Sequence, residues 1–490
     1  MQYDLVITGG HVLDPARGVD RITNVAVADG KIAAVGEQVD ATQAKRVLDA
    51  SGQYVTPGWF DMHVHAYSHL AFSHPDTIGV MQGVPTMLDA GGAGAWTYDD
   101  CRSYWEGRCK TDIFAFVMYN AAGIYTGARA ILDVETNNVL EIPLEEWKDV
   151  IGRNRDRVKM VKSAAITRLG FTPVAAAQQI SEATGVPIYM HVGDIGDFGN
   201  QPKHMTIITR EVIDMLRPGD IVTHVYTGNW GNLLDDRGTV YPEVMAAKKR
   251  GVLFDVGFGG LNFGFDAYDR LLNQGVVTDV ISSDLQGVNI TGPTHSLAHV
   301  MSLFMNFGMT LKDVVERVTI NPAKAQGLDH MIGSLTPGYP ARITVFGVEE
   351  GSYTFRDCEG GKRTGSQMIV PSHCVMDGEL IECDMEAGTA QENWSFMPAQ
   401  DDVAPNAAAL DGEQREFARA LVSDFRSVDW DDGKGLHSVF KGRVGAYGID
   451  ERKASDAVYD LLLESRFCVP VGWLLNGLEK DETLHRLAKA

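Results

Sequence analysis

Two histidines end a short apolar segment, Gly58-Trp-Phe-Asp-Met-His-Val-His65, that has the pattern of a buried β-strand. Side chains two residues apart on a strand point to the same side, so His63 and His65 should project together from its C-terminal end. Two imidazoles held in this way form half of a site for a divalent metal ion. A His-x-His pair alone is weak evidence, because most such pairs are ordinary surface or core residues.

Three more ionisable side chains end predicted strands further along the chain. His191, His224 and Asp284 each follow directly on an apolar segment of about four residues. In a barrel of parallel strands the chemistry lies at the C-terminal strand ends, so these side chains should meet the two histidines of the opening segment. A single strand-end His or Asp has ordinary structural roles, but several at one rim indicate a metal site.

A lysine within the fourth predicted strand, Val158-Lys-Met-Val-Lys162, supplies the remaining ligand. A buried lysine is costly unless it is neutral or paired, and a neutral amine can take up carbon dioxide to form a carbamate. This anionic group has two oxygens and can bridge two cations. Lys159 and Lys162 compete for the role, since strand parity lets only one of them face inward. We expect Lys159, as N6-carboxylysine.

Strands alternate with helical patterns from Gly58 onward, which predicts a parallel sheet. Eight such units over roughly 270 residues suit a (β/α)8 TIM barrel. A doubly wound sheet is the alternative, but no Gly-rich phosphate loop follows the first strand. The eight expected strands are Trp59–His63, Thr86–Asp89, Ile113–Val117, Val158–Lys162, Ile188–His191, Ile221–His224, Leu253–Val256 and Val280–Ser283.

The regions on both sides of the barrel differ from it. Residues 1–57 and 331–394 read as short strands with hairpin turns, and we expect them to form one small β-sandwich, because a few short strands cannot bury a face alone. The barrel itself, with the expected metal site, spans residues 58–330. Residues 395–490 form a polar, alanine-rich linker and a helical extension. The extension either presents a solvated helical face or makes an oligomer contact, and we expect a homo-oligomer.

The composition is that of an ordinary soluble enzyme, and the partner that we expect is a small-molecule substrate. The formal net charge of −22 argues against nucleic acid and anionic membrane surfaces as partners. The first residues lack the basic and apolar regions of a signal peptide, and no apolar run is long enough for a transmembrane helix. Six scattered cysteines without a Cys-x-x-Cys pair indicate free thiols and a cytoplasmic protein.

The chain resembles the amidohydrolase superfamily, and within it the amidohydrolase/deacetylase metallohydrolase branch related to dihydroorotases. The resemblance spans roughly residues 1–385 and leaves out the C-terminal hundred or so. The segments that carry it are Asp61-Met-His-Val-His65, Asp89-Ala-Gly-Gly-Ala-Gly94, Val158-Lys-Met-Val-Lys-Ser163, His191-Val-Gly-Asp194, Gly219-Asp-Ile-Val-Thr-His-Val-Tyr-Thr-Gly228, Gly251-Val-Leu-Phe-Asp-Val-Gly257, Asp279-Val-Ile-Ser-Ser-Asp-Leu285, Thr319-Ile-Asn-Pro-Ala-Lys-Ala325 and Gly333-Ser-Leu-Thr-Pro-Gly338.

The resemblance implies a centre of two divalent metal ions, with zinc expected and manganese, iron or cobalt as alternatives. It implies that His63, His65 and Asp284 hold the more buried ion. It assigns His191 and His224 to the other ion, and carboxylated Lys159, formed with CO2, to the bridge between them together with a hydroxide. Asp284 is then also the catalytic acid and base, since it can take the proton of the hydroxide and pass it to the leaving group.

Two positions depart from the pattern of the branch. The aspartate strand there usually runs on to a histidine, and Gln286 stands in that place, which leaves the substrate open. Arg342 ends the segment Pro337-Gly-Tyr-Pro-Ala-Arg342, where an aspartate is usual. This second change falls in the sandwich and should be structural.

The expected substrate contacts come from the loops at the strand ends. Arg168 could pair with a carboxylate of the substrate, or it could be a solvated residue at a helix start. A carboxylate-bearing substrate is therefore one possibility. The candidates are Tyr67, Asn120, Tyr125, Arg168, Asp194, Tyr226, Asn229, Asn262 and Gln286.

Hydrolysis of an acyclic N-acyl or O-acyl compound is the leading functional hypothesis. Ring opening of a cyclic amide, of the dihydroorotase or hydantoinase kind, is the second. A non-catalytic scaffold acting through its helical tail is a third. It is the least favoured of the three, because all six chemical positions are intact. The tail could also mediate self-association or cover the pocket of a neighbouring copy.

Overall fold

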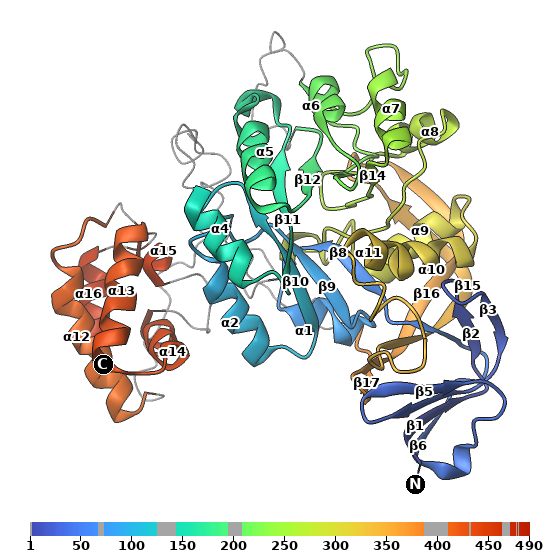
Figure 1. Cartoon of the computed structure of the whole chain (residues 1–490), viewed down its shortest axis with the longest axis horizontal. Helices are drawn as coiled ribbons and strands as arrows, with labels where there is room; N and C mark the ends of the chain where they lie inside the picture. The colour runs from blue at the N-terminus through green and yellow to red at the C-terminus, as the bar shows by residue number, and fades with distance from the viewer. Residues whose placement is uncertain are drawn as a thin grey trace.

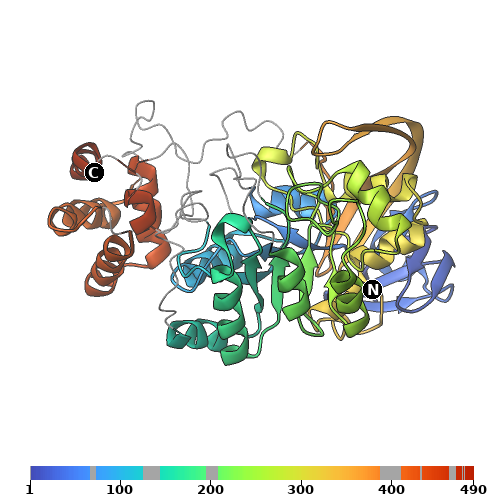
Figure 2. The same cartoon turned by 90° about the horizontal axis from the view of Figure 1, so that it is seen from above.

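The computed structural model has three parts, with the barrel between a β-sandwich at one end and a helical bundle at the other (Figures 1 and 2). This arrangement confirms the predicted fold class. None of the helices that the structure describes is long and apolar enough to cross a membrane. The structure describes residues 2–66, 73–124, 144–194, 208–386, 410–430, 433–462, 471–476, 478 and 480–490.

The barrel sheet contains seven hydrogen-bonded parallel strands in the order in which they occur in the chain. Short apolar segments form these strands, and their inward side chains fill the barrel with residues such as Met62, Phe116 and Met160. The strands are β8 (Phe60–Val64), β9 (Thr86–Ala90), β10 (Asp112–Met118), β11 (Val158–Ala164), β12 (Ile188–His191), β13 (Ile221–Thr223) and β14 (Leu253–Phe254).

The predicted eighth strand closes the barrel through two isolated bridges. Val280 pairs with Asp255 beside β14, and Leu285 pairs with Val64 of β8, both in parallel. The Asp284 amide also donates to the carbonyl of His63, at 2.6 Å. The segment 280–285 therefore joins the two edges of the sheet, and Asp284 ends beside the His-x-His strand.

The outer layer of the barrel is helical (Figure 1). Its helices bury a face with three- to four-residue spacing, as α8 does through Phe265, Tyr268 and Leu271. These helices are α1 (Pro75–Ile78), α2 (Tyr98–Arg108), α4 (Leu144–Arg153), α5 (Thr172–Thr184), α6 (Thr209–Met215), α7 (Pro242–Arg250), α8 (Phe265–Asn273), α9 (Leu297–Asn306), α10 (Leu311–Val318) and α11 (Ile320–Ala325).

The sandwich combines strands from both flanks of the barrel sequence. One sheet has the order β5-β4-β1-β6 and the other β17-β16-β15-β7-β2-β3. Their facing sides share an aliphatic core that includes Ile7, Val55 and Val345. The strands are β1 (Tyr3–Thr8), β2 (His11–Asp14), β3 (Val19–Ile22), β4 (Val25–Ala28), β5 (Lys31–Val35), β6 (Ala44–Asp49), β7 (Tyr54–Pro57), β15 (Ile343–Arg356), β16 (Lys362–Met376) and β17 (Glu379–Glu382).

The hairpin of β15 and β16 is longer than the sequence indicated, and its tip reaches the barrel. The carboxylate of Asp357 accepts from the backbone N–H of Phe265 at the start of α8, at 3.0 Å. The Cys358 amide donates to the carbonyl of Phe263, and its sulfur lies 3.5 Å from the carbonyl oxygen of Gly259. The sandwich thus contributes the tip of this hairpin to the loops that surround the strand ends.

The C-terminal bundle packs beside α2, as both views show. The Asp100 carboxylate of α2 lies 2.9 Å from Nε2 of His437 and 3.0 Å from Nζ of Lys441. Arg108 of α2 also pairs with Asp456. The bundle helices are α12 (Gly412–Phe425), α13 (Gly433–Tyr447), α14 (Glu451–Leu462), α15 (Val471–Asn476) and α16 (Lys480–Ala488).

Candidate metal centre

His63, His65 and Asp284 converge at the C-terminal ends of the barrel strands. The Oδ1 atom of Asp284 lies 3.4 Å from Nε2 of His63 and 3.4 Å from Nε2 of His65. All three side chains are buried. One ligand atom from each of His63, His224 and Asp284 falls within 4.8 Å of the others. Residues far apart in sequence therefore bring nitrogen and oxygen atoms together at the strand ends, where a metal ion could be held.

Lys162 is the lysine that reaches this group. Its side chain is buried, and its Nζ lies 3.2 Å from Nε2 of His63. Lys159 is partly exposed near the opposite end of the strand, with its Nζ 5.1 Å from the centre of the Phe114 ring. The expectation that Lys159 faces the histidines is therefore wrong. Met160 already belongs to the barrel interior, and strand parity then turns Lys162 inward as well.

His191 and His224 form the other side of the site, with ring centres 4.3 Å apart. Nε2 of His191 donates to the carbonyl of Gly193 at 2.7 Å, and Nδ1 of His224 donates to the carbonyl of Gly257 at 2.6 Å. A carbonyl can only accept, so each of these nitrogens carries the proton. The other ring nitrogen of each histidine keeps its lone pair for a metal ion.

Unusual backbone conformations aim two of these side chains. His224 and Asp284 have φ angles of 67° and 48°, in the left-handed region that residues other than glycine rarely adopt. Such conformations persist where the surrounding structure enforces them, and they cluster at functional sites. Gly259 faces the same carboxylate, because a Cβ atom there would lie 2.5 Å from Oδ2 of Asp284. The loop after β14 can pass this close only with glycine.

Burial sets the charges of the group. It lowers the pKa of His65 to about 3, with a further contribution from the positive charge of Lys162. Burial and the charge of Lys162 likewise lower the pKa of His191 to about 3. The histidines are therefore neutral at physiological pH, the form that binds metal ions. Burial also lowers the pKa of Lys162 and raises that of Asp284.

The residues present fit a divalent metal ion. Among the residues that the structure describes, Oδ1 of Asp284 receives no hydrogen bond although it is buried. A buried carboxylate oxygen without a donor is costly, and a cation held between it and the neutral histidines would remove that cost. Imidazole nitrogens with carboxylate oxygens are typical zinc ligands.

A polar cluster behind His63 was not anticipated from the sequence. Asp255 is fully buried in the β14 region, and its Oδ2 atom accepts hydrogen bonds from Tyr189, Thr223 and Ser282. The hydroxyl of Tyr189 also lies 2.8 Å from Nδ1 of His63. The spacing of Tyr189 and His191 could have indicated this cluster, because residues two apart on a strand share one face.

The expected substrate contacts have mixed outcomes. Asn262 meets the site, because its Nδ2 donates to Oδ2 of Asp284 at 3.4 Å. Tyr226 is a structural residue instead of a substrate contact: its hydroxyl donates to the carbonyl of Val276 and accepts from the amide of Thr278, and its ring packs against other aromatic rings.

Several of the other candidates bind backbone or cap loops. Asn120, Asp194 and Gln286 accept hydrogen bonds from the amides of nearby loops, and Asn229 donates to the carbonyl of Leu261. These bonds shape the loops at the strand ends. Tyr67, Tyr125 and the side chain of Arg168 lie outside the described residues.

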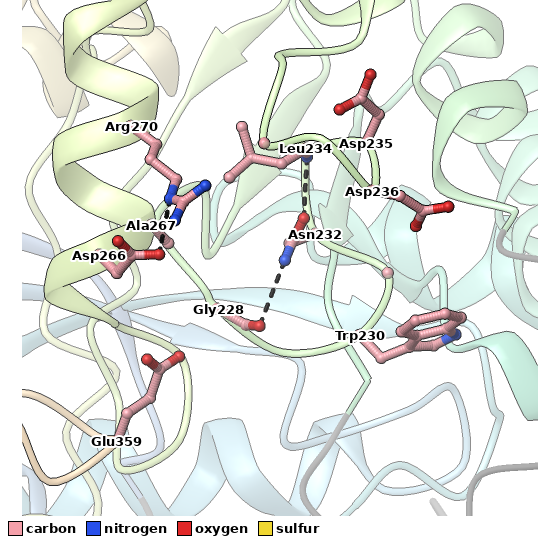
Figure 3. Close-up of a pocket in the computed structure, with 12 residues that line it drawn as sticks. Gly228, Trp230, Asn232, Leu234, Asp235, Asp236, Asp266, Ala267, Arg270 and Glu359 are labelled. Carbon is pink, nitrogen blue, oxygen red and sulfur yellow. Dashed lines mark hydrogen bonds and ion pairs between the residues drawn. The ribbon is translucent and has the colours of Figure 1, made fainter. Parts of the chain in front are cut away.

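A pocket of about 300 Å³ lies between the loop after β13, the start of α8 and the tip of the β15–β16 hairpin (Figure 3). Four carboxylates line it, and Asp266 among them accepts from Arg270 at 2.7 Å. None of the candidate metal ligands described above lines this pocket. Its acidic residues are Asp235, Asp236, Asp266 and Glu359.

A model of the amidohydrolase family matches residues 54–362. A deacetylase of Agrobacterium fabrum is 30% identical over 362 residues, which are 72% of this chain and 85% of the relative. A deacetylase of Enterococcus faecalis is 28% identical over 78% of this chain and all of its own length. A solved dihydroorotase structure is 28% identical and covers 78% of this chain and 98% of its own, with a TM-score of 0.65. The family match ends before the C-terminal helices.

Proposed function

This chain belongs to the amidohydrolase family, and we propose that it is a metal-dependent hydrolase that cleaves the acyl bond of an acyclic N-acyl or O-acyl small molecule. The observation that carries the proposal is the buried meeting of His63, Lys162 and Asp284, with Asp284 3.4 Å and Lys162 3.2 Å from the same imidazole nitrogen. Burying a lysine and a carboxylate beside neutral histidines destabilises the folded state. Such groups with shifted pKa values are typical of functional sites.

The ligands divide into two groups. His63, His65 and Asp284 would hold one divalent ion, and His191 and His224 the other. Lys162, in place of Lys159, would link the two as its carbamate. Zinc is the ion proposed. When bound, the pair of ions would supply an activated water and polarise the substrate carbonyl.

Burial prepares Lys162 for this role. The lowered pKa of its ammonium group favours the neutral amine, which is the form that reacts with carbon dioxide. A Cβ atom at Gly91 would lie 2.6 Å from Cβ of Lys162, so the loop after β9 packs directly on the lysine stem. The stem is thereby held in place at the barrel mouth.

Asp284 is the proposed catalytic acid and base. Its carboxylate would take a proton from the attacking water and deliver it to the leaving amine or alcohol. The Nδ2 donor of Asn262 touches Oδ2, while Oδ1 faces the two histidines. One oxygen of the carboxylate is thus directed to the metal side, and the other is held by the neighbouring loop.

The deacetylase names of the relatives support an acyclic acyl substrate, since they describe proteins that match this chain over most of their length. An assay of purified, zinc-loaded protein against N-acetyl amino acids, uncharged N-acetyl amines and O-acetyl esters tests this proposal. Release of acetate from at least one set is expected. Ring opening of cyclic substrates with no acetate released from any set would contradict it.

A cyclic amide substrate is the second candidate. The specific observation in its favour is a 61-residue segment that is 52% identical to a dihydroorotase of Anaeromyxobacter dehalogenans, although it is only 12% of this chain. Dihydropyrimidine and hydantoin rings in the same assay distinguish the two reactions. If a substrate carboxylate is recognised, Arg168→Ala should raise KM for charged substrates and leave KM for uncharged ones unchanged.

A further inference from the structure

We propose that Tyr189, held by Asp255, is a positioning residue that fixes the tautomer of His63 and so determines which of its nitrogens binds the metal ion. The inference rests on the metal centre of the proposed function. It assigns a role to a buried cluster that the ligand set does not include. Four side chains form this cluster: Tyr189, Thr223, Asp255 and Ser282.

One carboxylate oxygen of Asp255 accepts hydrogen bonds from three hydroxyl groups. Its Oδ2 atom accepts from the hydroxyl of Tyr189 at 2.6 Å, from Ser282 at 2.7 Å and from Thr223 at 2.8 Å. The carboxylate is fully buried. An ionised carboxylate can only accept, so each hydroxyl must direct its single hydrogen toward Asp255.

This arrangement decides the proton position on His63. The oxygen of Tyr189 lies 2.8 Å from Nδ1 of His63, and the oxygen of Thr223 lies 3.2 Å from the same atom. Both hydroxyl hydrogens are already directed to Asp255, so these oxygens present lone pairs to the imidazole. Nδ1 must then carry the proton. The lone pair is left on Nε2, the nitrogen that faces Asp284 and Lys162.

His63 differs in this respect from the neighbouring ligands. His191 and His224 are oriented by backbone carbonyls, which no side-chain substitution removes. The orientation of His63 depends on side chains, and its tautomer can therefore be changed by mutation. Tyr189 also packs edge-on against the His63 ring at 5.3 Å between centres. The hydroxyl can be deleted while this packing stays, because Phe keeps the ring.

The test is the zinc and cobalt affinity of Tyr189→Phe, measured by competition with a chromophoric chelator. Loss of the group that hydrogen-bonds a ligating histidine typically weakens metal binding roughly 10- to 100-fold. We expect a loss of affinity in that range. Tyr268→Phe is the matched control, since it removes another buried hydroxyl, one that donates to the carbonyl of Phe307 outside the site. Its metal affinity should equal that of the unmodified chain.

A double-mutant cycle separates positioning from general loosening of the core. On a His63→Ala background, Tyr189→Phe should have no further effect on affinity for the remaining site, because its partner is gone. The melting temperature of the metal-free protein should change little in Tyr189→Phe, whereas the rise in melting temperature on adding zinc should shrink. Asp255→Asn supplies a second variant, because the amide can donate and so lets the hydroxyls turn toward His63.

The outcomes separate this inference from the proposed function. Wild-type affinity in both Tyr189→Phe and Asp255→Asn, with metal lost in His63→Ala, would overturn the positioning role and leave the hydrolase proposal standing. An equal loss in Tyr189→Phe with and without His63 would also overturn it. If the unmodified chain binds no metal and hydrolyses nothing, both proposals fail together.

Discussion

At the scale of single residues, the candidate site depends on a few buried ionisable groups, and only as a group could they hold a metal ion. Asp284 is the sharpest example, because it faces two histidines and is a ligand and a proton carrier at once in the proposed reaction. The sequence predicted its position from the end of an apolar strand. It could not predict the left-handed backbone that aims it, since φ near 48° at an aspartate is enforced by the surrounding loops.

Asp284→Asn should abolish most hydrolysis while the fold persists. An amide cannot take up the proton, so we expect kcat to fall by roughly 10²- to 10⁴-fold. Steady-state assays together with circular dichroism measure this. Asp266→Asn is the control, since Asp266 lies at the acidic pocket and pairs with Arg270 on the surface. Full activity in Asp284→Asn would remove this residue from the catalytic role.

The two lysines show where sequence reasoning stops at this scale. Alternation allows only one of Lys159 and Lys162 to face inward, and this was correctly predicted. Which one does so depends on the phase of the strand against the barrel interior. Met160 sets that phase by filling the interior, but a short strand of Val, Met and Lys residues carries no signal that identifies Met160 as the inward residue. The choice is therefore a property of the assembled barrel.

At the scale of elements, the joint between barrel and sandwich depends on a buried charge cluster. The carboxylate of Asp112, at the start of β10, pairs with Arg342 from the sandwich and with Arg157 before β11. The side chains of Asp112 and Arg342 are each about 10% exposed. The departure from the family pattern at residue 342 is thus structural, as expected from the sequence, and it ties β10 to the chain that leads into β15.

Arg342→Ala should weaken this joint. Its removal leaves Arg157 as the remaining partner of the buried Asp112 carboxylate, so we expect the loss of a charged hydrogen bond, about 2 kcal/mol of unfolding free energy. Urea denaturation of the metal-free protein measures the loss. Arg363→Ala is the control, because its partner Asp269 is about half exposed and surface pairs contribute less than about 1 kcal/mol. Equal losses in the two variants would refute a special role for Arg342.

The same cluster predicts a pH dependence. Burial opposes ionisation of Asp112, but the guanidinium groups of Arg342 and Arg157 outweigh it and hold its pKa below the usual value. A pKa lowered by folding means that the ionised carboxylate stabilises the protein above its ordinary pKa near 4, and that this contribution is lost as the pH falls through the folded-state pKa. Asp112→Asn should therefore lose less stability than the unmodified chain between pH 5 and pH 3, measured by urea midpoints with chelator present.

The ends of helices and strands were predictable where the sequence pattern and the tertiary contacts of the element agree. Helix α10 shows such agreement, because Val314, Val315 and Val318 form its buried face and the side chain of Thr310 caps its first turn. The hairpin of β15 and β16 extends beyond the short strands that the sequence predicted, because its outer part is polar and is held by contacts such as that between Arg363 and Asp269 on α8. Tertiary contact, and not strand periodicity, extends these strands.

At the scale of the whole molecule, the C-terminal bundle is the part that the family match does not cover. Polar contacts join it to α2 of the barrel, where the carboxylate of Asp100 meets His437 and Lys441. The sequence predicted a helical extension, and α12 and α14 have its apolar spacing. Helix α13 is harder to recognise, because its four glycines and mixed polarity conceal the helical periodicity. Homo-oligomer formation remains a prediction.

Asp100→Ala should loosen the bundle without affecting the metal centre. The carboxylate is the shared partner of His437 and Lys441, so its removal takes away both of these contacts between α2 and α13. We expect faster hydrogen exchange and proteolysis in α13 and unchanged hydrolysis. Glu106→Ala, on the same helix but in an exposed i,i+4 pair with Arg102, should leave α13 protected. Unaltered exchange in both variants would show that the α2 contact does not hold the bundle.

The central claim is that Lys162 and its neighbours form a centre of two divalent ions, and the most direct test is the metal content of two matched variants. Lys162→Ala and Lys159→Ala remove the same side chain from one strand, three residues apart. After zinc loading and dialysis, mass spectrometry should find about two zinc ions per chain in the unmodified protein and in Lys159→Ala, and about one or fewer in Lys162→Ala. Two ions retained in Lys162→Ala, or an equal loss in both variants, would contradict this account.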